Sequence, residues 1–291
     1  MIHTFKKFWF VSLLALFLAA CGGTDTGNEE ASENGDNNNS QANEEVSSGG
    51  ALTVAYSAQP ATYDPHMTTA VATSDIMRNV YETLVTIDAD HQFQPMLAES
   101  YEISEDGLQI TFHLREGILF HNGEEMTSED VVASMERWKE LSSMGRAQFA
   151  EAAFEAEDDY TVVLNLPKPL STALSVLSGN MGAFPAIMPK EVVDGATETG
   201  IEEYIGTGPF EFTELRQDVH VQLSKYDDYQ SREEEANGLA GQKEALVDEI
   251  YFVFVTDPST RVAGLLSGEY DMAHAVPHDN IDQVEANPNI E

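Results

Sequence analysis

The clearest structural signal lies between Ser104 and Gly117, where the chain reads SEDGLQITFHLREG. Its first four residues are typical of a tight turn, and from position 108 apolar residues alternate with polar ones. The apolar members of this alternation are Leu108, Ile110, Phe112 and Leu114. Because successive side chains of a strand point to opposite faces, these four would share one buried face of a sheet. The stretch therefore predicts a turn that leads into the second strand of a hairpin.

Other strands are predicted on both sides of this hairpin. Upstream, residues 52–56 read LTVAY and are followed by turn-prone residues at Gln59-Pro60 and at 63–65. Further strands are expected downstream, at residues 160–166, 210–213, 219–223 and 250–255.

Three helices are predicted from apolar spacing and from capping residues. The first covers residues 74–84, where apolar residues recur every four positions. The second begins at Thr127, which forms a capping box with Asp130. The third follows the strand at 250–255 and ends at Gly268. Since strands and helices are mixed throughout the chain, the α/β or α+β class is predicted.

The chain carries a large excess of acidic residues. Its 291 residues include 51 Asp and Glu against 14 Lys and Arg, which gives a formal net charge of -37 at pH 7. This balance argues against nucleic acid or an anionic lipid surface as a partner, because phosphate contacts need basic groups. A single cysteine excludes an intramolecular disulfide framework and a zinc site built from several cysteines.

That cysteine, Cys21, follows a segment typical of secretion signals. Two lysines precede an apolar run at residues 8–20, which ends in small residues. This run of 13 residues is shorter than the ~20 that span a bilayer as a helix. The Leu-Ala-Ala-Cys arrangement resembles the bacterial lipoprotein box, which implies a signal peptide at residues 1–20 and a lipid anchor on Cys21. An incidental cysteine is the alternative.

Residues 21–50 are expected to form a lipidated, disordered acidic tether. Between positions 22 and 50 three residues are apolar, seven are acidic and none is basic. Such a segment cannot bury enough apolar surface to offset the entropy lost on ordering. The globular part would therefore stay near a membrane, held by the acyl chains on Cys21.

Six local stretches between positions 64 and 271 occur in a recognisable order. They are DPH at 64–66; YETL at 81–84; LAE at 97–99 with FHLREG at 112–117 and FHNG at 120–123; TSEDV at 127–131; GTGPF at 206–210; and PSTR at 258–261 with LSGEYD at 266–271. Together they resemble the N-terminal portion of the bacterial extracellular solute-binding proteins of family 5. That family includes the peptide- and nickel-binding lipoproteins of ABC importers.

The resemblance implies a periplasmic-binding-protein-like fold of type II, in which two lobes close around a solute, with an accessory α+β domain. Lobe I would comprise residues 51–86 and 191–273, and the accessory domain residues 87–190. Residues 274–291 would begin lobe II, which would be largely missing. We therefore expect residues 51–291 alone to bind peptide weakly or not at all. Calorimetric binding in the micromolar range would contradict this expectation.

By the same resemblance, an extended peptide would be held by main-chain hydrogen bonds to the segment after the first strand. On this chain that segment is Ser57, Ala58 and Gln59, flanked by Tyr56 and Tyr63. The alternative interpretation of these residues is an ordinary turn at the end of a strand.

The glycines of GTGPF and two histidines receive structural interpretations. Gly206, Gly208 and Pro209 are expected to form a bend or hinge between lobes, because the segment lacks the lysine of a phosphate-binding loop. His113 and His121 have no evident third ligand, so hydrogen-bonded surface histidines are favoured over a metal site. No metal and no cofactor is expected.

Other polar residues also receive predictions. Arg115 is expected to pair with Glu116 or another acid, and His66 is expected in a turn. Asp227 and Asp228 are expected in a solvated loop. The chain shows no nucleophile elbow, paired-histidine zinc motif or nucleotide loop, so an enzyme is not predicted.

The predicted function is that of a substrate-binding lipoprotein of an ABC importer. It would capture oligopeptides or dipeptides and deliver them unchanged to the permease subunits, as a monomer on the outer face of the cytoplasmic membrane. Nickel chelates and small sugars are alternative cargo. A surface signalling or adhesion lipoprotein built on the same scaffold is the alternative class.

Overall fold

The computed structural model of the chain describes residues 49–180, 182 and 184–290. The predicted signal peptide, Cys21 and most of the predicted tether lie outside these residues. All of the described residues belong to one compact unit. No helix within these ranges is long and apolar enough to cross a membrane.

The alternating stretch forms β5 (Gln109–Leu114), an inner strand of a four-stranded antiparallel sheet. The strand order is β4 (Ala98–Ile103), β5, β7 (Thr161–Asn165) and β6 (Ala153–Asp158). In the turn before β5, the N–H of Gly107 donates to the carbonyl of Ser104 at 2.8 Å. The predicted hairpin is therefore confirmed, with β4 as its first strand.

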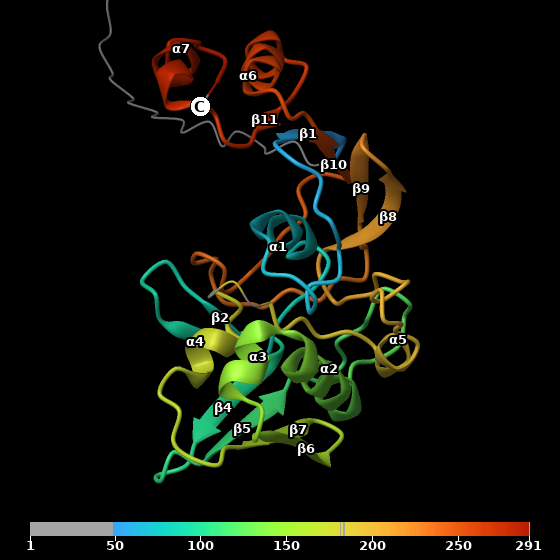
Figure 1. Ribbon diagram of the computed structural model, residues 1–291, viewed down its shortest axis with the longest axis vertical. Coiled ribbons are helices and arrows are strands. Elements are labelled where there is room, and N and C mark those ends of the chain that lie inside the picture. Colours follow the sequence, from blue (N-terminus) through green and yellow to red (C-terminus); the bar gives the residue numbers. More distant parts are fainter. Residues whose placement is uncertain (1–48, 181, 183, 291) are drawn as a thin grey trace, which may run out of the picture. The chain divides into compact units, whose positions relative to one another are not determined.

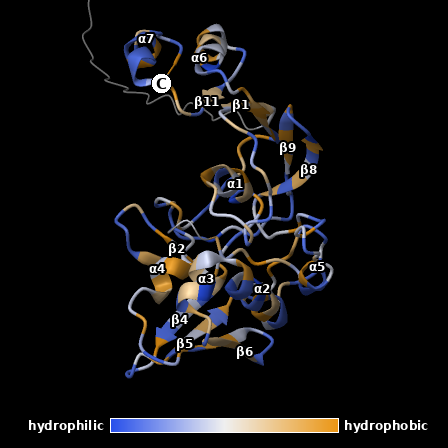
Figure 2. Ribbon diagram, viewed as in Figure 1, coloured by the Kyte–Doolittle hydropathy of each residue, from blue (hydrophilic) through white to orange (hydrophobic). Residues whose placement is uncertain are grey.

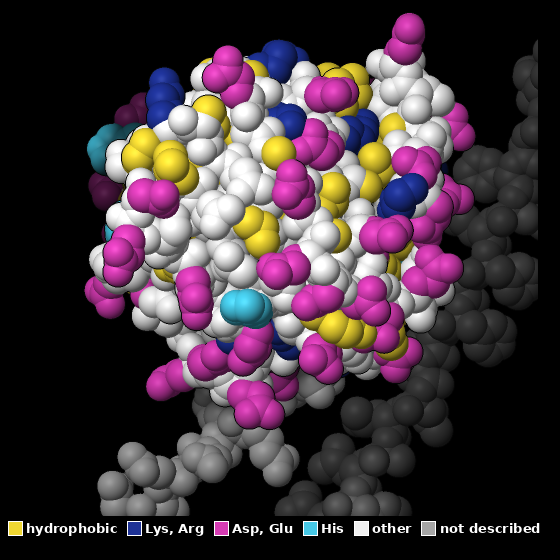
Figure 3. Space-filling view, turned by 90° about the horizontal axis from the view of Figure 1, so that it is seen from below, with side chains coloured by type: hydrophobic (Ala, Val, Ile, Leu, Met, Phe, Trp, Pro, Cys, Tyr) yellow, Lys and Arg dark blue, Asp and Glu magenta, His cyan; other side chains and the backbone are white. Residues whose placement is uncertain are grey.

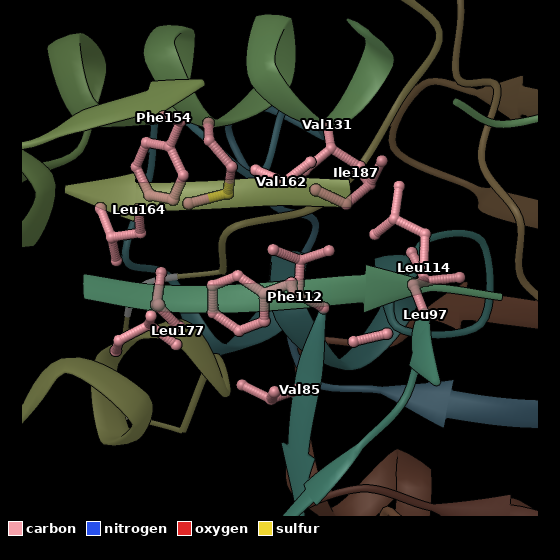
Figure 4. Packing of buried hydrophobic residues seen from close by; sticks show 14 of the residues in the cluster. Val85, Leu97, Phe112, Leu114, Val131, Phe154, Val162, Leu164, Leu177 and Ile187 are labelled. Carbon is pink, nitrogen blue, oxygen red and sulfur yellow. The ribbon is translucent and has the colours of Figure 1, made fainter. Parts of the chain in front are cut away.

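Apolar side chains on one face of this sheet form a buried cluster. Phe112 and Val162 are fully buried, and Figure 4 shows them gathered with side chains from neighbouring elements. Those elements include α2 (Ser128–Leu141), which contributes Val131, and α4 (Ala173–Leu177), which Figure 2 shows as strongly hydrophobic. Each such buried side chain contributes about 1.5–3 kcal/mol relative to an exposed one.

The start of α2 is fixed by the predicted capping box, which is present. One carboxylate oxygen of Asp130 accepts the N–H of Thr127 at 2.8 Å. Its other oxygen accepts the N–H of Lys190, the first residue of α5 (Lys190–Asp194), at 2.8 Å. Asp130 therefore joins the beginnings of two helices. A short helix, α3 (Ser143–Gln148), directly follows α2.

A second, mixed sheet has five strands in the order β11-β1-β10-β9-β8 (Figure 1). β1 (Ala51–Tyr56) runs parallel to both of its neighbours, β10 (Glu249–Phe254) and β11 (Met272–Ala273). β9 (His220–Lys225) is antiparallel to β10 and to the outer strand β8 (Phe210–Arg216). The strands predicted in these regions are confirmed, with small differences at their ends.

The first predicted helix is wrong in its extent. It was expected over residues 74–84, whereas α1 spans Val71–Met77. The side-chain amide of Asn79 donates to two carbonyls of the last turn, at 2.9 and 3.0 Å, which competes with continued helix formation. Val80 and Leu84 are nevertheless buried, so their spacing in the sequence reflects burial in the core and not helical structure.

The third predicted helix is confirmed as α6 (Pro258–Ser267). Its end is set by Gly268, which has a φ of 75° in the left-handed region that favours glycine. The remaining elements are β2 (Val85–Ile87), β3 (Phe93–Pro95), η1 (His278–Asn280) and α7 (Ile281–Glu285).

Buried apolar side chains form two clusters, one on each of the two larger sheets. A buried ion pair connects the segment after β1 with α2: Arg137 binds both carboxylate oxygens of Asp64, at 3.1 and 2.5 Å. Burial by itself raises the pKa of Asp64, but the hydrogen bonds and charge of Arg137 lower it overall. The boundaries drawn between lobe I and the accessory domain stay predictions.

Candidate ligand-binding site

Three parallel strands end at the same edge of the five-stranded sheet. β1 ends at Tyr56, β10 at Phe254 and β11 at Ala273, with β1 between the other two. In open α/β sheets, ligands bind in the crevice outside the carboxyl ends of the strands. This edge, which includes the predicted segment Ser57, Ala58 and Gln59, is therefore the candidate site.

Tyr56 is the last residue of β1 and its side chain is buried. Its hydroxyl donates to Asp75 of α1 at 2.6 Å, and its ring stacks on the imidazole of His274 with 4.3 Å between centroids. Burial raises the pKa of Tyr56, and the carboxylate of Asp75 raises it further. The phenol therefore stays protonated and acts as a fixed hydrogen-bond donor.

Of the three residues after Tyr56, Ser57 and Gln59 have side chains that are held by hydrogen bonds. The Ser57 hydroxyl lies 2.9 Å from Nδ1 of His274, and Oε1 of Gln59 accepts the N–H of Asp218 at 2.6 Å. Ala58 is exposed. Among the described residues, no N–H or C=O of Ser57, Ala58 or Gln59 is bonded to another backbone group. These groups are available to an extended ligand.

The side chain of Tyr63 is not exposed at this edge of the sheet. It is 3% exposed and packs against Tyr204 and Phe212 in the buried cluster of the five-stranded sheet. The structure thus groups Tyr56 and Ser57 with His274 and places Tyr63 in the core. A ligand contact by Tyr63 stays a prediction.

Gly206 and Gly208 lie where the chain passes very close to another backbone segment. A β-carbon would stand 2.0 Å from the Val80 carbonyl at Gly206, and 2.5 Å from the Asn79 carbonyl at Gly208. Both positions therefore require glycine for space. The hinge predicted for these two residues and Pro209 remains a prediction.

His121 is hydrogen-bonded, as expected, but it is only partly exposed. The N–H of Gly206 donates to its Nδ1 at 3.2 Å, so the proton is on Nε2, which donates to the Gly208 carbonyl at 2.9 Å. Burial lowers the pKa of His121, which keeps the imidazole neutral. The described residues contain no group of three or more His, Cys, Asp or Glu that could hold a metal ion.

Arg115 binds carbonyls rather than the acid that was expected. Its Nη2 donates to the carbonyls of Gln230 and Ser231 at 2.8 and 3.1 Å. His66 lies in a turn, as predicted, and it is also buried, with its Nε2 2.9 Å from the carbonyl of Ala186. Asp227 and Asp228 are both exposed, as predicted for a solvated loop.

Sequence reasoning missed His274, which directly follows β11 and contacts the predicted segment from far along the chain. It lies 217 positions after Ser57, and nothing in the local pattern around either residue indicates the contact. It also missed Asp75, which holds the Tyr56 hydroxyl.

The fold and this edge are those of an α/β binding protein whose candidate ligand segment follows a central parallel strand. The family model of the bacterial extracellular solute-binding proteins, family 5 (middle part), matches residues 92–291 of the sequence. The chain therefore belongs to this family. Its fold is that of the type II periplasmic binding proteins.

Sequence similarity to individual proteins supports this assignment. The chain is 30% identical over 233 residues to a probable peptide ABC transporter periplasmic-binding protein of Sinorhizobium fredii, and this covers 78% of the chain and 43% of the relative. It is 29% identical over 243 residues to the glutathione-binding protein GsiB of Escherichia coli K12, covering 82% and 45%. The chain spans about half the length of the curated relatives it matches.

Solved structures give the same picture. The periplasmic binding protein DppA of Helicobacter pylori, in complex with the peptide STSA, matches with a TM-score of 0.71 and 27% identity. The match covers 84% of this chain and 50% of DppA.

Proposed function

We propose that this chain contributes the segment after β1 to a solute-binding protein that captures peptides outside the membrane and delivers them to the permease of an ABC importer without changing them chemically. The family includes solute-binding proteins, and the named relatives comprise a probable peptide-binding protein, a glutathione-binding protein and a protein solved with a bound peptide. Cys21 would carry the lipid anchor that keeps the protein on the outer face of the cytoplasmic membrane.

The observation that carries the proposal is the free backbone after β1. Ser57, Ala58 and Gln59 offer N–H and C=O groups that are not bonded to other backbone groups within the described part of the chain, at the edge where three parallel strands end. An extended peptide can pair with such groups as an added strand would, and this mode tolerates varied side chains. The function therefore requires main-chain donors at these positions and no nucleophile, general base or metal.

The proposal is tested by removing one main-chain donor. In cells that produce the full protein, Ala58→Pro should lower uptake of a labelled oligopeptide at limiting concentration by about tenfold or more, because proline has no N–H. The matched control is Ala61→Pro, which places proline at another exposed alanine of the same loop.

Two results would contradict the proposal. One is unchanged peptide uptake when the gene is deleted, and the other is an equal loss of uptake in both proline variants. Thermal unfolding of each variant shows whether the folded protein is retained. If uptake of a nickel chelate falls instead of peptide uptake, the cargo is the alternative one.

A further inference from the structure

The guanidinium of Arg261 binds four backbone carbonyls at the candidate site. Arg261 belongs to the first turns of α6 and is 4% exposed. Its Nη1 donates to the carbonyls of Val255 and Thr256 at 2.7 and 3.1 Å. Its Nε and Nη2 donate to the carbonyls of His274 and Ala275 at 2.9 and 3.1 Å. Hydrogen bonds from a charged donor are stronger than those between neutral groups.

These four carbonyls belong to two segments that flank β1. Val255 and Thr256 directly follow β10, and His274 and Ala275 directly follow β11. One side chain therefore connects the chain on both sides of the strand that carries the ligand segment. Ala275 has a φ of 54°, a left-handed conformation that a residue with a β-carbon rarely adopts. Its carbonyl is among those that Arg261 holds.

His274 extends this connection to the ligand segment itself. Its N–H donates to the Ala55 carbonyl at 2.9 Å, its ring stacks on Tyr56 and its Nδ1 contacts the Ser57 hydroxyl at 2.9 Å. A continuous set of contacts thus runs from Arg261 through His274 to Ser57.

The start of α6 does not depend on Arg261. The side chain of Asp257 caps the helix by accepting the N–H of Thr260 at 2.7 Å, and Pro258 occupies the first turn. Loss of the Arg261 guanidinium therefore removes the link between β10 and β11 without removing the helix cap.

We propose that Arg261 is a positioning residue that, acting through His274, holds Ser57 and the adjoining free backbone in the orientation that accepts an extended ligand. This inference rests on the proposed function in one respect, namely that the ligand contacts residues 57–59. The positioning itself is a property of the protein without ligand and can be measured separately.

The first measurement uses the full protein without ligand. In Arg261→Lys, a single ammonium cannot reach four carbonyls in two segments. We expect the amides of Val255 and His274, which are bonded to β1, to exchange hydrogen for deuterium about tenfold faster. NMR order parameters at Ser57, Ala58 and Gln59 should fall from about 0.85 toward about 0.6.

The matched control is Arg146→Gln. Arg146 also donates to two backbone carbonyls, those of Glu140 and Leu141 at 2.9 and 2.7 Å, but it lies on α3. The substitution Arg146→Gln should leave amide exchange and NMR order parameters in the segment after β1 unchanged. Unchanged order at residues 57–59 in Arg261→Lys would overturn the inference. So would a uniform rise in exchange across both sheets, since that would make Arg261 a residue of general stability.

The second measurement separates positioning from function. His274→Phe keeps a ring that can stack on Tyr56 but loses the nitrogen beside Ser57, so order should fall at Ser57 while exchange of the Val255 amide stays unchanged. Both variants should raise the peptide concentration needed for half-maximal uptake by about tenfold and leave the maximal rate unchanged. If order changes as expected but the unmodified protein imports no peptide, the proposed function fails and the positioning role stands.

Discussion

At the scale of single residues, His66 shows how burial sets protonation. Its side chain is 1% exposed, Nε2 contacts the Ala186 carbonyl and Nδ1 has no hydrogen-bond partner among the described residues. Burial lowers the pKa of His66 to about 4, and the positive charge of Arg137 acts in the same direction while Asp64 opposes it. The folded protein therefore holds this imidazole neutral.

This burial predicts a loss of stability in acid. Between an ordinary pKa of 6.5 and the folded value of about 4, the unfolded chain binds a proton that the folded protein does not. The free energy of unfolding should therefore fall by about 3 kcal/mol as the pH drops through this range. Below about pH 4, His66 should contribute no further loss of stability. In His66→Gln, urea unfolding at pH 7 and pH 4 should show a smaller difference.

The control for this prediction is His278→Gln, at an exposed histidine. The pH dependence of the unfolding free energy should be smaller in His66→Gln than in this control. An identical dependence in His66→Gln and in the unmodified protein would show that His66 does not resist protonation.

At the scale of elements, Asp130 connects two helices through backbone donors of Thr127 and Lys190. Asp130→Ala would leave both N–H groups unpaired at the starts of α2 and α5. We expect the free energy of unfolding, measured by urea titration, to fall by about 2 kcal/mol. Glu129→Ala is the matched control, because Glu129 is an exposed acid in the same turn and should change stability by less than about 0.5 kcal/mol. Equal effects of the two substitutions would refute the capping role.

Several elements could be predicted from local sequence because their causes are local. β5 follows from the alternation at Gln109–Leu114, α2 from the box at Thr127, and the end of α6 from Gly268. The end of α1 could not be predicted, because the side chain of Asn79 ends the helix while the apolar spacing continues to Leu84.

The candidate site could be predicted only in part, because only some of its contacts are local in the sequence. The segment Ser57–Gln59 follows a strand that is visible in the sequence. His274, which contacts Ser57, and Asp75, which binds the Tyr56 hydroxyl, come from other parts of the chain, as does Arg261, which binds the His274 carbonyl. The parallel pairing of β1 with β11 brings His274 to the segment. Contacts across such distances in the chain leave no local pattern.

At the scale of the whole molecule, the dominant property is like charge. The formal net charge is -37, and Figure 3 shows Asp and Glu side chains spread over the face in view, with Lys and Arg side chains among them. Such repulsion opposes the compact state and is screened by salt. We expect the free energy of unfolding to rise by about 1 kcal/mol or more between about 10 mM and 0.2 M sodium chloride.

Raising the sodium chloride concentration further should change the free energy of unfolding less, because the Debye length is already about 8 Å near physiological ionic strength. Urea titrations at each salt concentration measure this dependence. A fall in stability over the lower range would show that attractive ion pairs, such as the pair of Arg137 with Asp64, outweigh repulsion.

The most direct test of solute capture after β1 is hydrogen–deuterium exchange of the native protein, isolated from the cells that make it, with and without saturating oligopeptide. The amides of Ser57, Ala58 and Gln59 have no backbone partner among residues 49–180, 182 and 184–290, and they should exchange rapidly without ligand. With peptide bound, we predict that their exchange slows by about tenfold or more. Peptide binding that protects other segments and leaves these three amides unchanged would contradict the account.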